Sequence, residues 1–152
     1  MSIPFIDLAA QQKRLRPEIE ARLNKVLDHG GYIMGAEVAE LETALCSRLS
    51  MKHTISCSSG TDALILGLSG LGLKPGDGVI VPSFTFAASA EAIAVLGAAP
   101  VFAEVEEASF NLDPDRLADA LAAGRQEGLN VVGVMPVGLF GQPAALDRIA
   151  AF

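Results

Sequence analysis

Apolar residues recur along the chain in two different patterns, and these patterns predict alternating helices and strands. In some segments apolar side chains recur every three or four positions, which is typical of helices. These segments are residues 17–29, 36–49, 61–71, 87–96, 113–123 and 144 onward. Short unbroken runs of β-branched and apolar residues predict strands over 54–57, 79–81, 100–105 and 130–136. The segment 61–71 is apolar on nearly every side, so we expect that helix to be buried.

This alternation predicts an α/β fold, with an open and mostly parallel sheet that helices cover on both faces. We expect the chain to divide into an N-terminal helical segment, residues 1–35, and an α/β domain, residues 36–152. The candidate linker is the glycine-bearing stretch 30–35.

Composition excludes several classes of protein. Eleven Lys and Arg against eighteen Asp and Glu give a net charge of −7, which disfavours a broad nucleic-acid or anionic-membrane surface. A hydrophobic fraction of 51% excludes disorder. No uncharged apolar run reaches the ~18–20 residues that a membrane span needs. The first residues lack the features of a signal peptide, and two cysteines without a C-x-x-C motif are typical of a reduced cytoplasmic compartment.

Two further features lead us to expect part of a larger protein. The mean hydropathy of +0.41 is high for a free-standing domain. The last expected helix is still running at Phe152, where an α/β domain would normally return to the sheet with another strand.

The segment that joins the first expected strand to the helix 61–71 is a candidate phosphate site. Free amides at a helix N-terminus attract anions, Gly60 allows close approach, and hydroxyls of Ser59 and Thr61 can add hydrogen bonds beside Asp62. The alternative is that Ser59 or Thr61 simply caps the helix and Gly60 makes the turn.

Two phenylalanines follow the strand 79–81, at the edge of the sheet where ligands bind in open α/β folds. Either Phe84 or Phe86 could stack on a planar heterocycle, although taken alone, packing of both rings in the core is the better interpretation. The loop 135–143 follows another strand to the same edge but contains no titratable side chain. Two histidines and two scattered cysteines have no metal-ligand spacing, so we expect no metal site.

Seven short segments, taken in order, carry a resemblance to a known family. They are IPFIDL (3–8), GAEV (35–38), SSGTDAL (58–64), PGD (75–77), VPSFTF (81–86), GAAPVF (97–102) and FGQP (140–143). The chain resembles, over essentially its whole length, the start of the DegT/DnrJ/EryC1/StrS sugar aminotransferases. These are pyridoxal-phosphate (PLP) enzymes of fold type I, and the chain resembles the N-terminal half of their large PLP-binding domain.

The resemblance implies transfer of an amino group, usually from glutamate, to a keto group on a nucleotide-linked sugar, by an enzyme that is a homodimer at full length. It implies that Ser59, Gly60, Thr61 and Asp62 hold the cofactor phosphate and that Phe86 stacks on the pyridine ring. It also places a segment with Gly31, Tyr32 and Gly35 at the substrate entrance.

The chain also departs from the family pattern. The family's Schiff-base lysine, and the aspartate that pairs with the pyridine nitrogen, follow the region that matches this chain. We therefore assign no catalytic residue, since Lys13, Lys25, Lys52 and Lys74 lie in the wrong context, and we expect the isolated chain to be inactive. Gly138 stands where many relatives carry a polar residue.

Two other functions stay open at this point. One is a stand-alone, non-catalytic α/β interaction or regulatory module, which an exposed apolar face would suit. The other is a small nucleotide- or flavin-binding domain, which the missing glycine fingerprint disfavours.

Overall fold

The computed structural model describes residues 5–152. Ile3 and Pro4, the first two residues of the IPFIDL segment, lie outside the described residues. The chain forms two compact units, one that ends at Ser56 and one from Cys57 to Phe152. The expected division of the chain into residues 1–35 and residues 36–152 stays a prediction.

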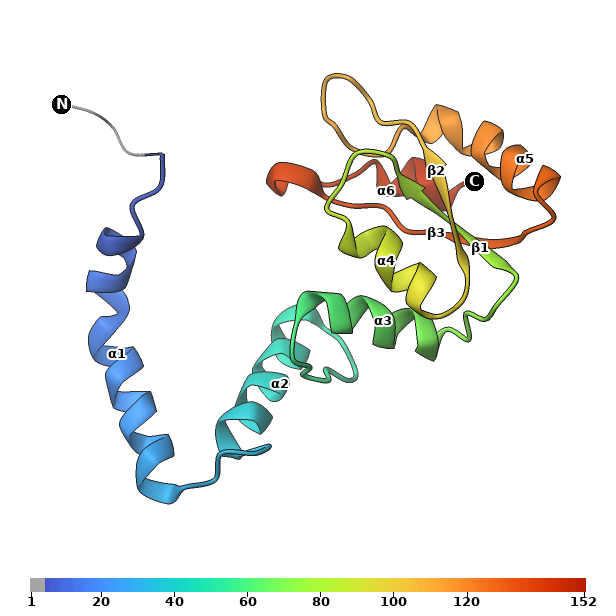
Figure 1. The fold of residues 1–152 in the computed structure, drawn as a ribbon. Helices are drawn as coiled ribbons and strands as arrows, with labels where there is room; N and C mark the ends of the chain where they lie inside the picture. Colours follow the sequence, from blue (N-terminus) through green and yellow to red (C-terminus); the bar gives the residue numbers. More distant parts are fainter. Residues whose placement is uncertain (1–4) are drawn as a thin grey trace. The chain divides into compact units, whose positions relative to one another are not determined.

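The first unit contains two helices, α1 (Leu8–His29) and α2 (Ala36–Leu49) (Figure 1). The bounds of α2 agree with the sequence, but α1 begins at Leu8 rather than at Pro17. The earlier start has a local cause, because the Asp7 side chain accepts a hydrogen bond of 3.0 Å from the amide of Ala10 and caps the helix. Pro17 therefore lies inside α1, not in its first turn.

The strand expected at 54–57 is not formed, and this prediction was wrong. The amide and hydroxyl of Ser56 both donate to the Glu42 carboxylate, at 2.8 and 2.9 Å, and Ile55 is 82% exposed. A β-branched run forms a strand only where a neighbouring strand takes up its backbone groups. Here a glutamate side chain takes up the amide instead.

The second unit alternates helices with three strands (Figure 1). Its elements are α3 (Gly60–Gly70), β1 (Asp77–Pro82), α4 (Ala88–Val95), β2 (Ala99–Ala103), η1 (Pro114–Arg116), α5 (Leu117–Gln126), β3 (Asn130–Val134), η2 (Leu139–Gly141) and α6 (Leu146–Ala150).

The strands form one parallel sheet in the order β2-β1-β3. The chain leaves β1 in one direction to reach β2 and then crosses back over β1 to reach β3. Right-handed crossovers in opposite directions put their helices on opposite faces, and α4 and α5 lie on opposite sides of the sheet. The predicted open parallel sheet, flanked by helices, is confirmed.

Alternate residues of β1 build two cores. Ile80 lies in the α5 core with Val101 and Leu117, whereas Val79 and Val81 lie in the other core with Ile93 of α4. Because β1 is buried on both faces, its middle residues form an unbroken apolar run, Val79–Ile80–Val81.

Helix α3 is less buried than its sequence predicts. None of its residues is buried, and Leu71, directly after its end, is 87% exposed. Leu68 packs against the core formed by Val79, Val81 and Ile93, so α3 contributes one side to the core and leaves the other in solvent. Across residues 5–152, no helix combines the length and the apolar character needed to cross a membrane.

Candidate functional site

The loops that follow the three strands meet at one edge of the sheet, which we call the carboxyl edge. The connection from β1 to β2 runs in one direction across the sheet, and the connection from β2 to β3 runs back in the other. This reversal makes a switch point at the carboxyl edge, and ligands of open α/β sheets bind at such points. Helix α3 begins near this edge, since Ala63 and Leu64 line the same groove as Met135 and Pro136, which follow β3.

The first turn of α3 presents two amides to solvent. The Ser59 hydroxyl accepts the amide of Asp62 at 3.1 Å, and the Ser59 carbonyl accepts the amide of Ala63 at 3.0 Å. Ser59 is therefore the helix cap, as the simpler interpretation of the sequence holds. Within the described residues, however, the amides of Gly60 and Thr61 have no hydrogen-bond partner. Capping by Ser59 thus leaves these two amides as a candidate anion seat.

The space around this seat is open, and a carboxylate lies beside it. A Cβ atom on Gly60 would meet nothing within 4 Å. The Asp62 carboxylate accepts hydrogen bonds from the hydroxyls of Ser58 and Ser59, which lower the pKa of Asp62. Asp62 is therefore anionic at neutral pH and stabilises the positive end of α3.

Neither phenylalanine after β1 lies in the core, so that interpretation was wrong. Phe84 is 50% exposed and packs against the ring of Phe110, with centroids 5.5 Å apart. Phe86 is 77% exposed, and no ring of the described residues pairs with it. The two residues therefore have different surroundings, and Phe86 is the one whose ring is free to meet a ligand.

A buried asparagine, which the sequence does not single out, joins the other two loops of the carboxyl edge. Asn111 follows β2 and is 3% exposed. Its amide nitrogen donates to the carbonyls of Gln142 and Pro143, at 3.1 and 3.2 Å, and its side-chain oxygen accepts the amide of Leu139 at 2.9 Å. No local pattern indicates this role, because its partners lie about thirty positions further along the chain. Gly138 lies in the same loop, directly before η2.

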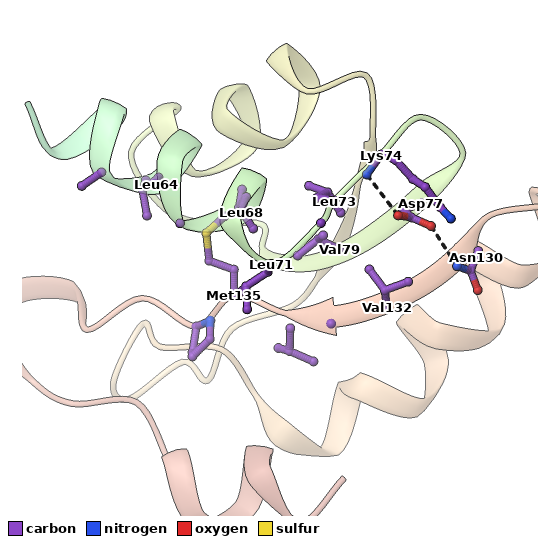
Figure 2. A pocket seen from close by; sticks show the side chains of 16 residues that line it. Leu64, Leu68, Leu71, Leu73, Lys74, Asp77, Val79, Asn130, Val132 and Met135 are labelled. Atoms are coloured by element: carbon purple, nitrogen blue, oxygen red, sulfur yellow. Dashed lines mark hydrogen bonds between the residues drawn. The ribbon is translucent and has the colours of Figure 1, made fainter. Parts of the chain in front are cut away.

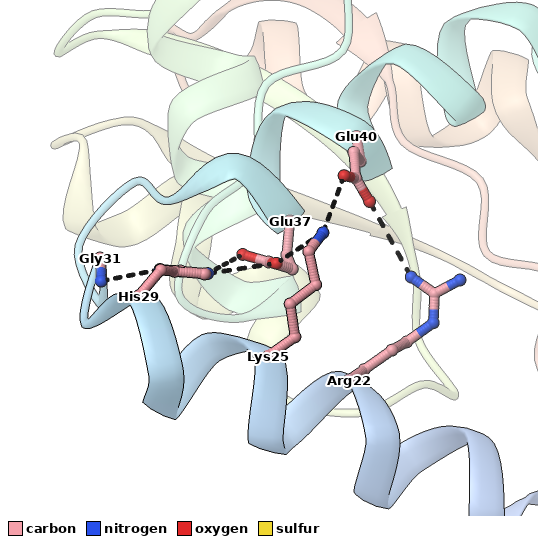
Figure 3. Close-up of polar contacts among 6 residues, drawn as sticks. All are labelled: Arg22, Lys25, His29, Gly31, Glu37 and Glu40. Atoms are coloured by element: carbon pink, nitrogen blue, oxygen red, sulfur yellow. Dashed lines mark hydrogen bonds and ion pairs between the residues drawn. The ribbon is translucent and has the colours of Figure 1, made fainter.

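In the first unit, the segment with Gly31, Tyr32 and Gly35 connects α1 to α2. Gly35 needs to be glycine, because a Cβ there would lie 2.2 Å from the carbonyl oxygen of Gly31. The amide of Gly31 donates to Nδ1 of His29 at 2.9 Å (Figure 3). Since Nδ1 accepts this bond, Nε2 carries the proton and donates to Glu37 at 3.1 Å.

Charged side chains hold α1 and α2 together beside this segment (Figure 3). Lys25 contacts Glu37 at 3.2 Å and Glu40 at 3.3 Å. Its hydrogen bond to Glu37, followed by that to Glu40, raises the pKa of Lys25. A bond from its own backbone amide, followed by those from Lys25 and His29, lowers the pKa of Glu37.

An apolar groove of about 540 Å³ lies between α3 and the strands β1 and β3 (Figure 2). Leucines of α3 line one side, and Val132 and Met135 line the other. Its polar end lies at the start of β1, where Asp77 accepts the amide of Lys74 at 3.1 Å and the side chain of Asn130 at 2.8 Å. Lys74 therefore lies at the edge of the sheet opposite the carboxyl edge.

Comparison with known proteins identifies the family. The model of the DegT/DnrJ/EryC1/StrS aminotransferase family matches residues 13–152. The chain is 44% identical over 149 residues to the UDP-2-acetamido-2-deoxy-3-oxo-D-glucuronate aminotransferase of Pseudomonas aeruginosa, covering 98% of this chain and 40% of that protein. It is 39% identical to the dTDP-3-amino-3,4,6-trideoxy-alpha-D-glucose transaminase of Streptomyces venezuelae, covering 97% of this chain and 37% of that protein.

Solved structures agree. A DegT DnrJ EryC1 StrS aminotransferase from Brucella abortus superposes with a TM-score of 0.92 at 46% identity, covering 99% of this chain and 40% of that one. NtdA from Bacillus subtilis, solved with the bound cofactor PMP, gives 0.88 at 29% identity, covering 99% of this chain and 33% of that one. The chain thus spans about 40% or less of the length of these relatives and has the fold of their N-terminal part. It belongs to the DegT/DnrJ/EryC1/StrS aminotransferase family.

Proposed function

We propose that the complete protein is a PLP-dependent aminotransferase that acts on a nucleotide-linked keto-sugar, with an amino donor such as glutamate. One observation carries the proposal, namely that the amides of Gly60 and Thr61 are free at the start of α3 in a chain of this family. The names of the relatives, which act on UDP- and dTDP-linked sugars, support this substrate class.

The residues present fit the phosphate of PLP. The amides of Gly60 and Thr61 would bind its oxygens, with hydroxyls of Ser59 and Thr61 beside them and Asp62 behind the cap. The open space at Gly60 would leave room for a phosphate beside its amide. When bound, the cofactor supplies an aldehyde and a ring that withdraws electrons from the substrate.

Phe86 would lie against the pyridine ring. Its exposed ring follows the strand β1 at the carboxyl edge, and contact between flat rings contributes about 0.5–1.5 kcal/mol beyond burial. This contact would orient the ring after the phosphate has fixed its position.

The segment with Gly31, Tyr32 and Gly35 would line the substrate entrance. Its conformation depends on the close approach of Gly35 to Gly31 and on the hydrogen bond from Gly31 to His29. We further infer that the complete enzyme is a cytoplasmic homodimer, as is usual in the family.

The 152-residue chain alone should not transfer amino groups. A nucleophilic amine must lose its proton, yet Glu37 and Glu40 stabilise the ammonium form of Lys25. Lys74 lies at the edge of the sheet opposite the carboxyl edge. Lys13 is on α1, and Lys52 is in the loop after α2.

The test uses PLP and borohydride. The chain is mixed with PLP, reduced, digested and searched for a modified lysine, and the complete protein is assayed with glutamate and a UDP- or dTDP-linked keto-sugar. We expect turnover by the complete protein and no stoichiometric labelling of the short chain. A complete protein that retains no PLP would contradict the proposed function, and a short chain with one fully labelled lysine and turnover would contradict its inactivity.

A second candidate is a non-catalytic interaction module. The apolar groove beside α3 favours it, because apolar surfaces of this kind are usually covered by another protein segment. The coding sequence beyond Phe152 separates the two candidates. A further strand with an aspartate and a loop with a lysine indicate the enzyme, whereas a stop codon followed by unrelated sequence indicates the module.

A further inference from the structure

Two phenylalanines at the carboxyl edge have a left-handed backbone. Phe110 has φ of 57° and Phe140 has φ of 56°, and neither is glycine. This conformation is uncommon for residues with a bulky side chain, and it persists only where the surroundings impose it. Something in the fold must therefore hold these two residues.

Asn111 is placed to hold both. It directly follows Phe110, and its side chain binds the backbone of Leu139, Gln142 and Pro143, on either side of Phe140. The carbonyl of Asn111 also accepts the amide of Glu106 at 2.9 Å, which closes its own loop. Because Asn111 is buried, these bonds cannot be exchanged for bonds to water without a cost.

The ring of Phe110 carries this constraint to the loop after β1. It lies 5.5 Å from the ring of Phe84 and 6.1 Å from the ring of Phe140, measured between centroids. The three rings thus come from the loops that follow β1, β2 and β3, one from each. We call Phe84, Phe110 and Phe140 the aromatic brace.

The loop that carries Phe86 is held at three points. The amide of Ser83 donates to the carbonyl of Ala103 at 2.8 Å, and the amide of Ser89 donates to the carbonyl of Phe86 at 3.2 Å. Between them, the side chain of Phe84 contacts Phe110. The contact with Phe110 thus fixes the loop at Phe84, and the ring of Phe86, two residues further on, is exposed.

We propose that Asn111 is a positioning residue for Phe86. It fixes Phe110, which fixes Phe84, and the loop 83–86 then presents the ring of Phe86 at the carboxyl edge. This inference rests on the proposed function, in which Phe86 meets the cofactor ring.

The test measures amide hydrogen exchange in the 152-residue chain, without cofactor. Asn111→Asp has the same shape but cannot donate to Gln142 and Pro143. We expect it to accelerate exchange about tenfold at the amides of Ser83 and Ser89, whose hydrogen bonds to Ala103 and Phe86 hold the two ends of the loop, in addition to its own loops 105–112 and 137–143. Asn130→Ala, which removes a hydrogen bond to Asp77 at the opposite edge, is the matched control and should leave both amides unchanged.

Phe110→Gly removes the ring but allows the same backbone conformation, so it tests the role of the ring alone. It also replaces Asn111→Asp as the test if that variant does not fold. Glycine accepts a φ of 57° without strain, so the amides of Leu139 and Gln142 should keep their protection, while those of Ser83 and Ser89 lose it because the ring is absent. If Ser83 and Ser89 keep wild-type exchange in Phe110→Gly, the inference is wrong. Acceleration that extends equally over β1 and the rest of α4 would also contradict it, since that is a general loss of stability.

In the complete protein, Asn111→Asp should speed the loss of PLP and change the circular dichroism of the bound cofactor. If the wild-type protein binds no PLP, the proposed function fails while the exchange result still stands. If PLP is retained equally by both proteins and Phe86→Ala alone releases it, the positioning role of Asn111 is contradicted.

Discussion

The Ser59 hydroxyl accepts the amide of Asp62 and donates to the carboxylate of the same residue, at 3.1 and 3.0 Å. The two residues close a ring at the first turn of α3. This ring stabilises the helix end, and the amides of Gly60 and Thr61 keep no hydrogen-bond partner within the described residues.

Ser59→Ala should lower the free energy of unfolding of the chain by roughly 1 kcal/mol, because the amide of Asp62 loses its acceptor. Urea unfolding followed by circular dichroism measures this. Ser58→Ala is the control, since Ser58 donates to Asp62 but caps no amide. Equal losses in the two variants would argue against Ser59 as the cap.

Phe86→Ala should weaken PLP retention in the complete protein more than Phe84→Ala does, while Phe84→Ala lowers stability more. The reason is the difference in surroundings, since Phe84 packs on Phe110 and Phe86 is exposed. Cofactor absorbance after dialysis and thermal unfolding measure the two effects. Equal cofactor retention in both variants would contradict the proposed contact between Phe86 and the pyridine ring.

The contact between Glu42 and Ser56 should make stability depend on pH. Hydrogen bonds from the amide and then the hydroxyl of Ser56 lower the pKa of Glu42 below the ordinary value of 4.5. The ionised form therefore stabilises the fold above that pH, and this stabilisation is lost as the pH falls through the lowered pKa. Glu42→Gln should be less stable than wild type at about pH 7, and the difference should shrink as the pH falls below 4.5 and through the lowered pKa of Glu42. Thermal unfolding across this range measures it, and a difference that does not change with pH would contradict the prediction.

Gly35→Ala should destabilise the first unit by about 1–3 kcal/mol, because the new Cβ would meet the carbonyl oxygen of Gly31 and backbone would have to move. Gly67→Ala is the matched control, since a Cβ there meets nothing within 4 Å inside α3. It should raise stability by about 0.5–1 kcal/mol through helix propensity. Amide exchange in residues 30–40 and urea unfolding follow the two changes.

The strands β1, β2 and β3 were predictable because each carries a short run of β-branched and apolar residues, although only β1 is buried along its whole length. Residues 54–57 have a similar local pattern and still form no strand, since pairing depends on neighbours that a local pattern does not contain. The burial of α3 also depends on neighbouring elements, so its apolar sequence predicted more burial than the structure shows. Helix patterns predicted α2 to the residue, and only the cap at Asp7 moved the start of α1.

In the candidate site too, local features could be predicted from the sequence, whereas features that depend on distant residues could not. The Ser59–Asp62 segment is local, so its geometry as a helix start followed from the sequence. The choice between Phe84 and Phe86 depends on Phe110, which lies in a different loop. Asn111 had no signal at all, because its role exists only once the loops after β2 and β3 lie together.

The central place of β1 has a consequence for how the chain folds during synthesis. Gly78 pairs with Ala99 of β2, whereas Asp77 pairs with Asn130 of β3, so the second pairing closes a loop more than twice as long. Until residues near 130 have left the ribosome, one side of β1 exposes unpaired backbone groups along its Val79–Ile80–Val81 run. Such an open edge is a template for aggregation. We therefore expect the nascent chain to be most prone to aggregation between completion of β2 and arrival of β3.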